Sequence, residues 1–160
     1  MRKIVLLATI VVVGFSMSLV KSADVEFSGN WVLTKRIPSL GAPPPNVLLV
    51  IKQTGNDLTV TQNDIDAEKT IESHYTLDGA ENVNSESNAA GPVTIRSTSK
   101  WSNSTLVIEG SNTFVGTDNT VTSKWMREYS LSENGAVLTV SEMHQTPFGP
   151  AVISLVFSRK

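Results

Sequence analysis

The chain has 160 residues, no cysteine, and 13 basic against 15 acidic side chains, which gives a formal net charge of −2. The absence of cysteine excludes disulfides, and an acidic chain without a basic stripe is a poor nucleic-acid binder, because that affinity depends on neutralising phosphates. The length allows one domain with a substantial core but not two.

Residues 1–22 have the pattern of a secretory signal peptide. Arg2 and Lys3 give a positive start, a nearly continuous apolar run follows, and small or apolar residues precede a cleavage site before Ala23. A membrane anchor is the alternative, but the run is short for a helix that needs about 20 residues to span a bilayer. We therefore expect an exported protein, secreted or periplasmic, whose single domain is residues 23–160 and whose formal charge is about −5 once the leader and its basic residues are removed.

The domain opens with the segment Phe-Ser-Gly-Asn-Trp at residues 27–31. In an extended strand, a period of two places Phe27, Trp31 and Leu33 on one face. Gly29 shares that face and has no side chain, so another backbone or ring can approach closely there. The Trp31 ring is large enough to plug one end of a closed barrel.

The rest of the chain alternates short apolar stretches with turn signals. A long loop comes first, because four prolines between residues 37 and 46 cannot continue a hydrogen-bonded ladder. Pairs such as Gly55-Asn56 and Asn134-Gly135 then indicate hairpin turns. Strands are expected at residues 47–53, 58–62, 70–77, 93–101, 105–109, 120–131, 137–143 and 152–159. Polar loops are expected at residues 80–92, with at most a short strand near Val83, and at 110–119 and 144–151.

About eight to ten short strands without helical periodicity predict an all-β, antiparallel up-and-down meander. Closing it into a barrel removes exposed edges, and a β-sandwich is the alternative.

The F-x-G-x-W pattern of residues 27–31 resembles the first-strand signature of the calycins, which include lipocalins, fatty-acid-binding proteins and avidin-like barrels. Arg159, in phase with Phe157 near the end of the last strand, is where calycins carry a basic residue. The resemblance implies a lipocalin-like barrel in which Gly29, Trp31 and Arg159 close one end, with Arg159 stacked on Trp31 by a cation–π contact. It also implies that loop 37–46 lies across the barrel mouth; an ordinary surface loop is the alternative.

The predicted inward faces combine small polar, aromatic and charged side chains where a dry core would carry valine or leucine. Burying Arg127 without a partner would cost several kcal/mol. Its partner could be a ligand carboxylate or phosphate, an internal acidic residue, or water at an open barrel end, and the two faces could also be inverted. The candidate ligand-binding residues are Tyr75, Ser97, Trp101, Trp125, Arg127 and Tyr129.

Catalytic and metal-binding motifs are missing from the sequence. The only histidines, His74 and His144, are 70 positions apart, and the acidic turn at residues 64–68 lacks the glycine and final glutamate of a calcium loop. We therefore expect no enzyme activity, no cofactor and no metal. Asn103 begins a glycosylation acceptor, which matters only in a host that glycosylates exported proteins.

The preferred interpretation is non-enzymatic binding or carriage of a small apolar or amphipathic ligand in the barrel interior. The alternative is a protein-binding module, such as an inhibitor of an exported hydrolase, acting through loops 37–46 and 144–151, where Leu40, Phe148 and prolines could make rigid contacts. Four charged residues on the predicted outer faces argue against a barrel that spans a membrane. They are Arg96, Lys100, Lys124 and Glu128.

Overall fold

The computed structural model describes residues 25–160 apart from residues 40, 42, 89–90, 117–118 and 147. The expected signal peptide and its cleavage site lie outside the described residues. The described chain forms ten β-strands. They are β1 (Gly29–Ile37), β2 (Val47–Thr54), β3 (Asp57–Asp64), β4 (Lys69–Thr76), β5 (Asn82–Asn88), β6 (Gly91–Ser102), β7 (Thr105–Val115), β8 (Thr120–Leu131), β9 (Val137–Thr146) and β10 (Gly149–Arg159).

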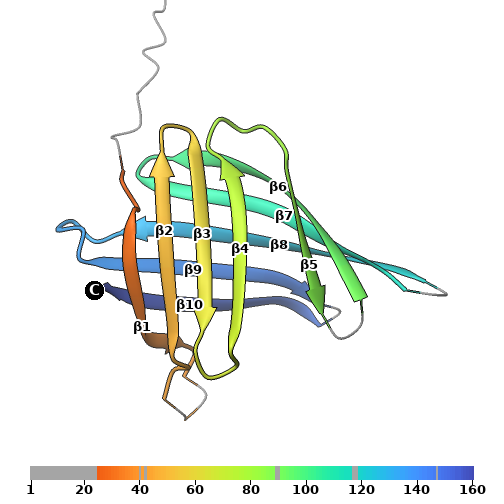
Figure 1. The fold of residues 1–160 in the computed structure, drawn as a ribbon, viewed down its shortest axis with the longest axis horizontal. Coiled ribbons are helices and arrows are strands. Elements are labelled where there is room, and N and C mark those ends of the chain that lie inside the picture. Colours follow the sequence, from red (N-terminus) through yellow and green to blue (C-terminus); the bar gives the residue numbers. More distant parts are fainter. Residues whose placement is uncertain (1–24, 40, 42, 89–90, 117–118, 147) are drawn as a thin grey trace, which may run out of the picture.

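All ten strands belong to one antiparallel sheet, in the order β4-β3-β2-β1-β10-β9-β8-β7-β6-β5. The first strand lies in the middle, where it pairs with both β2 and β10. The two strands at the ends of this order, β4 and β5, are consecutive in the chain and lie next to each other, so the sheet curls into a nearly closed barrel (Figure 1). In this view β1–β4 run steeply across β7–β10, as in orthogonally packed sheets. The prediction of an antiparallel up-and-down barrel is confirmed.

Residues 80–92 differ from the expected loop with at most a short strand. They contain the seven-residue strand β5 and the start of β6. The β5 sequence NVNSESN has one apolar residue, Val83, so it lacks the alternation that marks a half-buried strand. The strand forms because it makes a continuous ladder with β6, from Asn82 opposite Ser97 to Asn88 opposite Gly91.

The prediction of loops at residues 110–119 and 144–151 is wrong for most of both segments. The β7 strand continues to Val115 and β8 starts at Thr120, while β9 continues to Thr146 and β10 starts at Gly149. Pro150 is tolerated within β10 because β1 ends opposite Ser154, so this part of β10 has only β9 as a neighbour. Prolines occur in sheets at such edge positions, where the nitrogen can face solvent instead of a neighbouring strand.

The junction between β4 and β5 is held by side chains instead of a backbone ladder. The Asn84 side chain accepts a hydrogen bond from the His74 backbone N–H (2.9 Å) and donates one to the His74 carbonyl (3.0 Å). The Asn82 side chain accepts from the Thr76 N–H (2.9 Å) in the same way. The Ser99 hydroxyl donates to the Thr76 carbonyl. These side chains thus satisfy the backbone groups that an unpaired strand would leave open.

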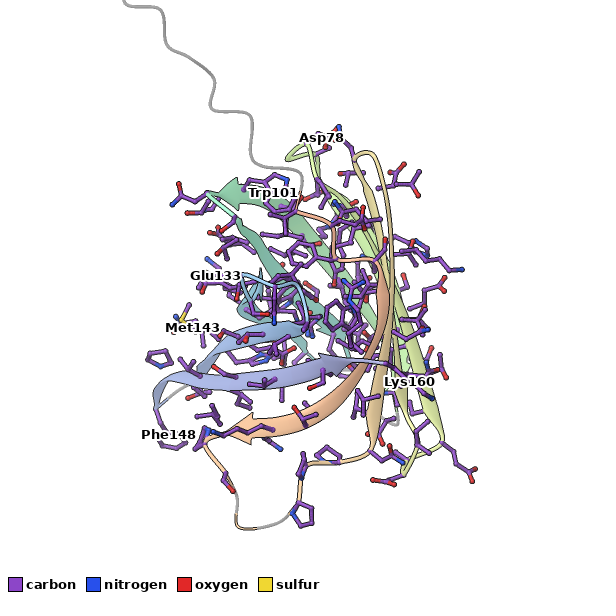
Figure 2. The ribbon with its side chains drawn as sticks, turned by 90° about the vertical axis from the view of Figure 1, so that its left-hand side faces the viewer. Asp78, Trp101, Glu133, Met143, Phe148 and Lys160 are labelled. Atoms are coloured by element: carbon purple, nitrogen blue, oxygen red, sulfur yellow. The ribbon has the colours of Figure 1, made fainter. Side chains whose placement is uncertain are left out.

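One end of the barrel is filled by aromatic side chains. Phe27 and Trp31 are completely buried, and the Phe27 ring stacks on Trp101 with ring centroids 5.9 Å apart. The Tyr129 and Phe27 rings make a T-shaped contact, with their centroids 6.1 Å apart. Figure 2 shows Trp101 towards this end of the molecule and Phe148 at the opposite end.

The structure brings together the three residues expected to close the barrel. Trp31 and Arg159 are directly opposite each other on β1 and β10, and the guanidinium carbon of Arg159 lies 4.6 Å from the centroid of the indole. The Trp31 Nε1 donates to the Phe27 carbonyl (2.9 Å). Gly29 has a φ of 147°, a conformation that other residues rarely adopt, and Arg159 packs against it.

We predict that Arg159→Met lowers the free energy of unfolding by about 0.5–2 kcal/mol, because it keeps the aliphatic stem but removes the cation from the indole face. Urea denaturation followed by circular dichroism measures this change. Arg159→Lys retains a cation and should lose less. An Arg159→Met variant as stable as the parent would show that the stacking does not stabilise the closed end.

We predict that Asn84→Ala lowers the free energy of unfolding by about 1–3 kcal/mol, because it leaves the His74 N–H and carbonyl without partners. Hydrogen exchange of the His74 amide should accelerate by more than the change in global stability explains. Ser85→Ala, an exposed neighbour on the same strand, is the matched control and should change neither quantity. Equal exchange rates in both variants would contradict the role given to Asn84.

Candidate ligand-binding cavity

The barrel interior contains two adjoining hollows, of about 220 Å³ and about 50 Å³. Their walls share residues of β3, β4, β5, β8, β9 and β10, and several of these lie near the β3–β4 and β9–β10 turns, away from Trp31. The larger hollow is lined by Gln62, Ile71, Ser73, Tyr75, Glu86, Ile95, Asn112, Trp125, Arg127, Glu142, His144 and Leu155. This mixture of apolar surface with a few polar groups is typical of small-molecule sites.

Arg127 lies in this wall and is paired with an acidic residue of the neighbouring strand. Arg127 on β8 is opposite Glu142 on β9, and its Nε lies 2.8 Å from the Glu142 Oε1. The Nε–H bond does not point at that oxygen, so the contact is an ion pair without a well-formed hydrogen bond. The Arg127 Nη1 donates to the Tyr75 hydroxyl (3.4 Å), and the guanidinium covers the Trp125 ring at 5.0 Å. Of the three partners considered from the sequence, the structure shows the internal acidic residue.

The charge states in this part of the wall follow from burial and the neighbouring groups. Burial acts to lower the pKa of Arg127, but Tyr129, Glu142 and Tyr75 together raise it above its ordinary value, so the guanidinium stays charged. Burial raises the pKa of Tyr129, so its phenol stays neutral. The Arg127 and Glu142 side chains are 30% and 19% exposed, respectively, and both line the hollows.

Trp125 owes its position to a glycine on the adjacent strand. Gly110 is directly opposite Trp125, and a β-carbon on Gly110 would lie only 2.5 Å from the indole. The Trp125 Nε1 donates to the Asn112 side-chain oxygen (2.7 Å). Gly110 and Asn112 fell in a segment expected to be a loop, so neither was among the candidate residues.

The six candidate ligand-binding residues are not all in one place. Tyr75, Trp125, Arg127 and Tyr129 line one or both hollows. Ser97 is buried but lines neither hollow, and Trp101 belongs to the aromatic plug. Their role in binding a ligand stays a prediction.

Sequence reasoning missed several polar residues of the wall. They are Gln62, Glu86, Asn112, Glu142 and His144. The partner of Arg127 had a visible signal: counting outward equally from the turn residues Asn134 and Gly135 places Arg127 opposite Glu142. His144 is two residues from Glu142 on β9, and its Nε2 lies 3.6 Å from the Glu142 Oε2.

Two polar features considered from the sequence, His74 and the acidic turn at residues 64–68, lie on the surface. His74 is exposed and contacts Glu72 at 3.0 Å, and Asp66 accepts a hydrogen bond from the Asn46 N–H (2.9 Å). Within the described residues, no group of three or more histidine and acidic side chains is placed to hold a metal ion. The same part of the chain contains no helix long and apolar enough to cross a membrane.

Comparisons with known proteins identify the fold. No protein-family model matches the sequence, and no curated protein matches it either. Solved structures do match. A zebrafish ileal bile acid-binding protein complexed with cholic acid has a TM-score of 0.60 at 14% identity, covering 84% of this chain and 98% of its own. Lipid binding protein 8 of Caenorhabditis elegans has a TM-score of 0.57 at 12% identity, covering 86% and 100%.

A secretory abundant heat soluble protein of Ramazzottius varieornatus also matches, with a TM-score of 0.59 at 16% identity, covering 83% of this chain and 94% of its own. At these identities the likeness concerns the fold. The chain thus has the antiparallel β-barrel fold of these structures, which is the fold that the first-strand pattern led us to expect. Its ten strands exceed the eight strands of lipocalins.

We predict that Glu142→Gln lowers the free energy of unfolding by about 1–3 kcal/mol, because Arg127 is then left in the wall without a compensating charge. The double variant Arg127→Met/Glu142→Leu should recover most of this loss, since it leaves no unpaired charge. Urea denaturation measures both changes. If the double variant is less stable than Glu142→Gln, the ion pair itself stabilises the barrel and the reasoning fails.

Proposed function

We propose that the protein binds a small apolar or amphipathic molecule inside its barrel and catalyses no reaction on it. The cavity of about 220 Å³ carries this proposal, because the barrel is packed around Phe27 and Trp31 but hollow beyond Tyr75 and Arg127. A well-packed domain has few voids larger than a water molecule, so a hollow of this size with aromatic and polar walls fits a ligand site.

Two further observations support this function. The Ile71, Ile95 and Leu155 side chains offer apolar surface to a ligand, while Ser73 and Tyr75 offer hydroxyls. In addition, two structures with the same fold are named for binding bile acid and lipid. Given the leader expected at residues 1–22, we propose that the protein acts after export, as a secreted or periplasmic carrier.

A second candidate function is protein binding at the β9–β10 turn. The Phe148 side chain is fully exposed there (Figure 2), and an exposed aromatic ring at a tight turn is a suitable anchor for a protein partner. An inhibitor of an exported hydrolase would use such a turn. Leu40, the apolar residue of the other loop considered, lies outside the described residues.

We predict that the purified full chain carries a ligand that native mass spectrometry detects as an extra mass and that organic extraction removes. Ser73→Phe should reduce severalfold the fraction of protein molecules that carry this extra mass, because the phenyl ring fills the larger hollow. Ser85→Phe adds the same ring to the outer face of β5 and should leave the ligand-bound fraction unchanged. Thermal unfolding of both variants separates lost binding from lost folding.

A clean mass that stays unchanged after incubation with lipid extracts would contradict the carrier function. Affinity capture with the parent and Phe148→Ala would then test the protein-binding function. Capture of the same partner by both proteins would exclude Phe148 as its anchor.

A further inference from the structure

The side chains that line both hollows carry more acidic than basic charges. Three of them line both hollows: Glu86 on β5, Arg127 on β8 and Glu142 on β9. The Arg127 and Glu142 charges compensate each other across 2.8 Å. The second oxygen of Glu142 faces His144, 3.6 Å away, so Glu142 is engaged on both sides.

Glu86 is the charge that remains. Within the described part of the chain its carboxylate makes no hydrogen bond and no ion pair, although it is half-buried. Its position on β5 explains this isolation. Asn82, Asn84 and Glu86 alternate on the inward face, and the first two bind the β4 backbone. Glu86 follows them, where no bond joins β5 to β4, and so faces the hollow instead of a strand.

A second polar group in the same wall also lacks a partner. Ser73 is about nine-tenths buried and lines both hollows, and its hydroxyl makes no hydrogen bond within the described residues. Because Ser73 lines the hollows and its hydroxyl has no partner in the described chain, this hydroxyl is available to a group that enters the cavity. The Ser73 hydroxyl can accept a hydrogen bond as well as donate one.

The cations of the paired strand β6 are not available to neutralise Glu86. Arg96 pairs with Glu81 (2.6 Å) and Lys100 with Glu109 (2.5 Å), both on the outer face of the barrel. The Arg127 guanidinium also covers the Trp125 ring, which is therefore not free to receive another cation. A positive group entering the hollow would find Glu86 as its nearest uncompensated charge.

We infer that the ligand of this cavity is an amphiphile with a cationic head group, such as an alkyl amine, rather than a carboxylic acid. Its ammonium group binds Glu86 and the Ser73 hydroxyl, and its apolar tail packs on Ile71, Ile95 and Leu155. A carboxylate head would meet the uncompensated charge of Glu86 and find Arg127 already paired. This inference rests on the proposed binding function and adds the class of head group.

The test uses three probes with the same tail and different heads: octylamine, 1-octanol and octanoate. Isothermal titration calorimetry of the full chain at neutral pH gives the three dissociation constants. We expect octylamine to bind about tenfold more tightly than 1-octanol, the effect of one partly desolvated ion pair, and octanoate to bind most weakly.

Glu86→Gln should bring octylamine and 1-octanol to within about twofold of each other, because only the charge is removed. Glu128→Gln changes the net charge equally but lies on the outer face of β8, so it should keep the tenfold preference. Circular dichroism and thermal unfolding confirm that both variants are folded.

The outcomes separate this inference from the function on which it rests. If octanoate binds as tightly as octylamine, or if the two variants behave alike, the inference on the head group is wrong while the binding function stands. If none of the three probes binds, both fail. If octylamine is preferred and only Glu86→Gln abolishes the preference, the cationic head group is established.

Discussion

The structure depends on closing a ten-strand sheet whose two outer strands do not form a ladder with each other. Unpaired backbone groups at a sheet edge are costly when buried and promote association when exposed. Asn82 and Asn84 meet this constraint by presenting side-chain amides to the β4 backbone. Because the closure uses these two inward positions, the next one, Glu86, is the first on β5 that faces the interior with no structural partner.

The contrast between the two halves of the interior follows from side-chain size and polarity. Around Trp31 the interior is filled by large aromatic rings, and Phe27 and Trp31 are completely buried. At the hollows the inward positions of β3, β4 and β7 carry Gln62, Ser73 and Asn112, which neither fill the space nor favour a dry core. The hollow thus results from the size and polarity of the inward side chains, while the barrel results from the backbone hydrogen bonds between neighbouring strands.

The sequence predicted the barrel better than the site. Alternation and Asn-Gly turns gave the half-buried strands, and Phe27 and Trp31 marked the closed end. The β5 strand was hidden because its stability comes from pairing and from asparagine side chains, neither of which leaves a hydrophobic period. Glu142 lay within an expected strand, but its role depends on the register of the β8–β9 hairpin, in which a shift of one residue changes every partner.

The same register decides what the arginine means for ligand choice. An inward Arg127 considered alone favours an anionic ligand, but its pairing with Glu142 makes it part of a neutral unit. The fold does not settle the matter, since one barrel architecture can host different ligands and the structural likeness here is at 12–16% identity. What distinguishes this cavity is the uncompensated carboxylate of Glu86. On the proposal made above, the selectivity of the barrel is set by a residue of its most polar strand, where the closure of the sheet leaves a charge for the ligand to balance.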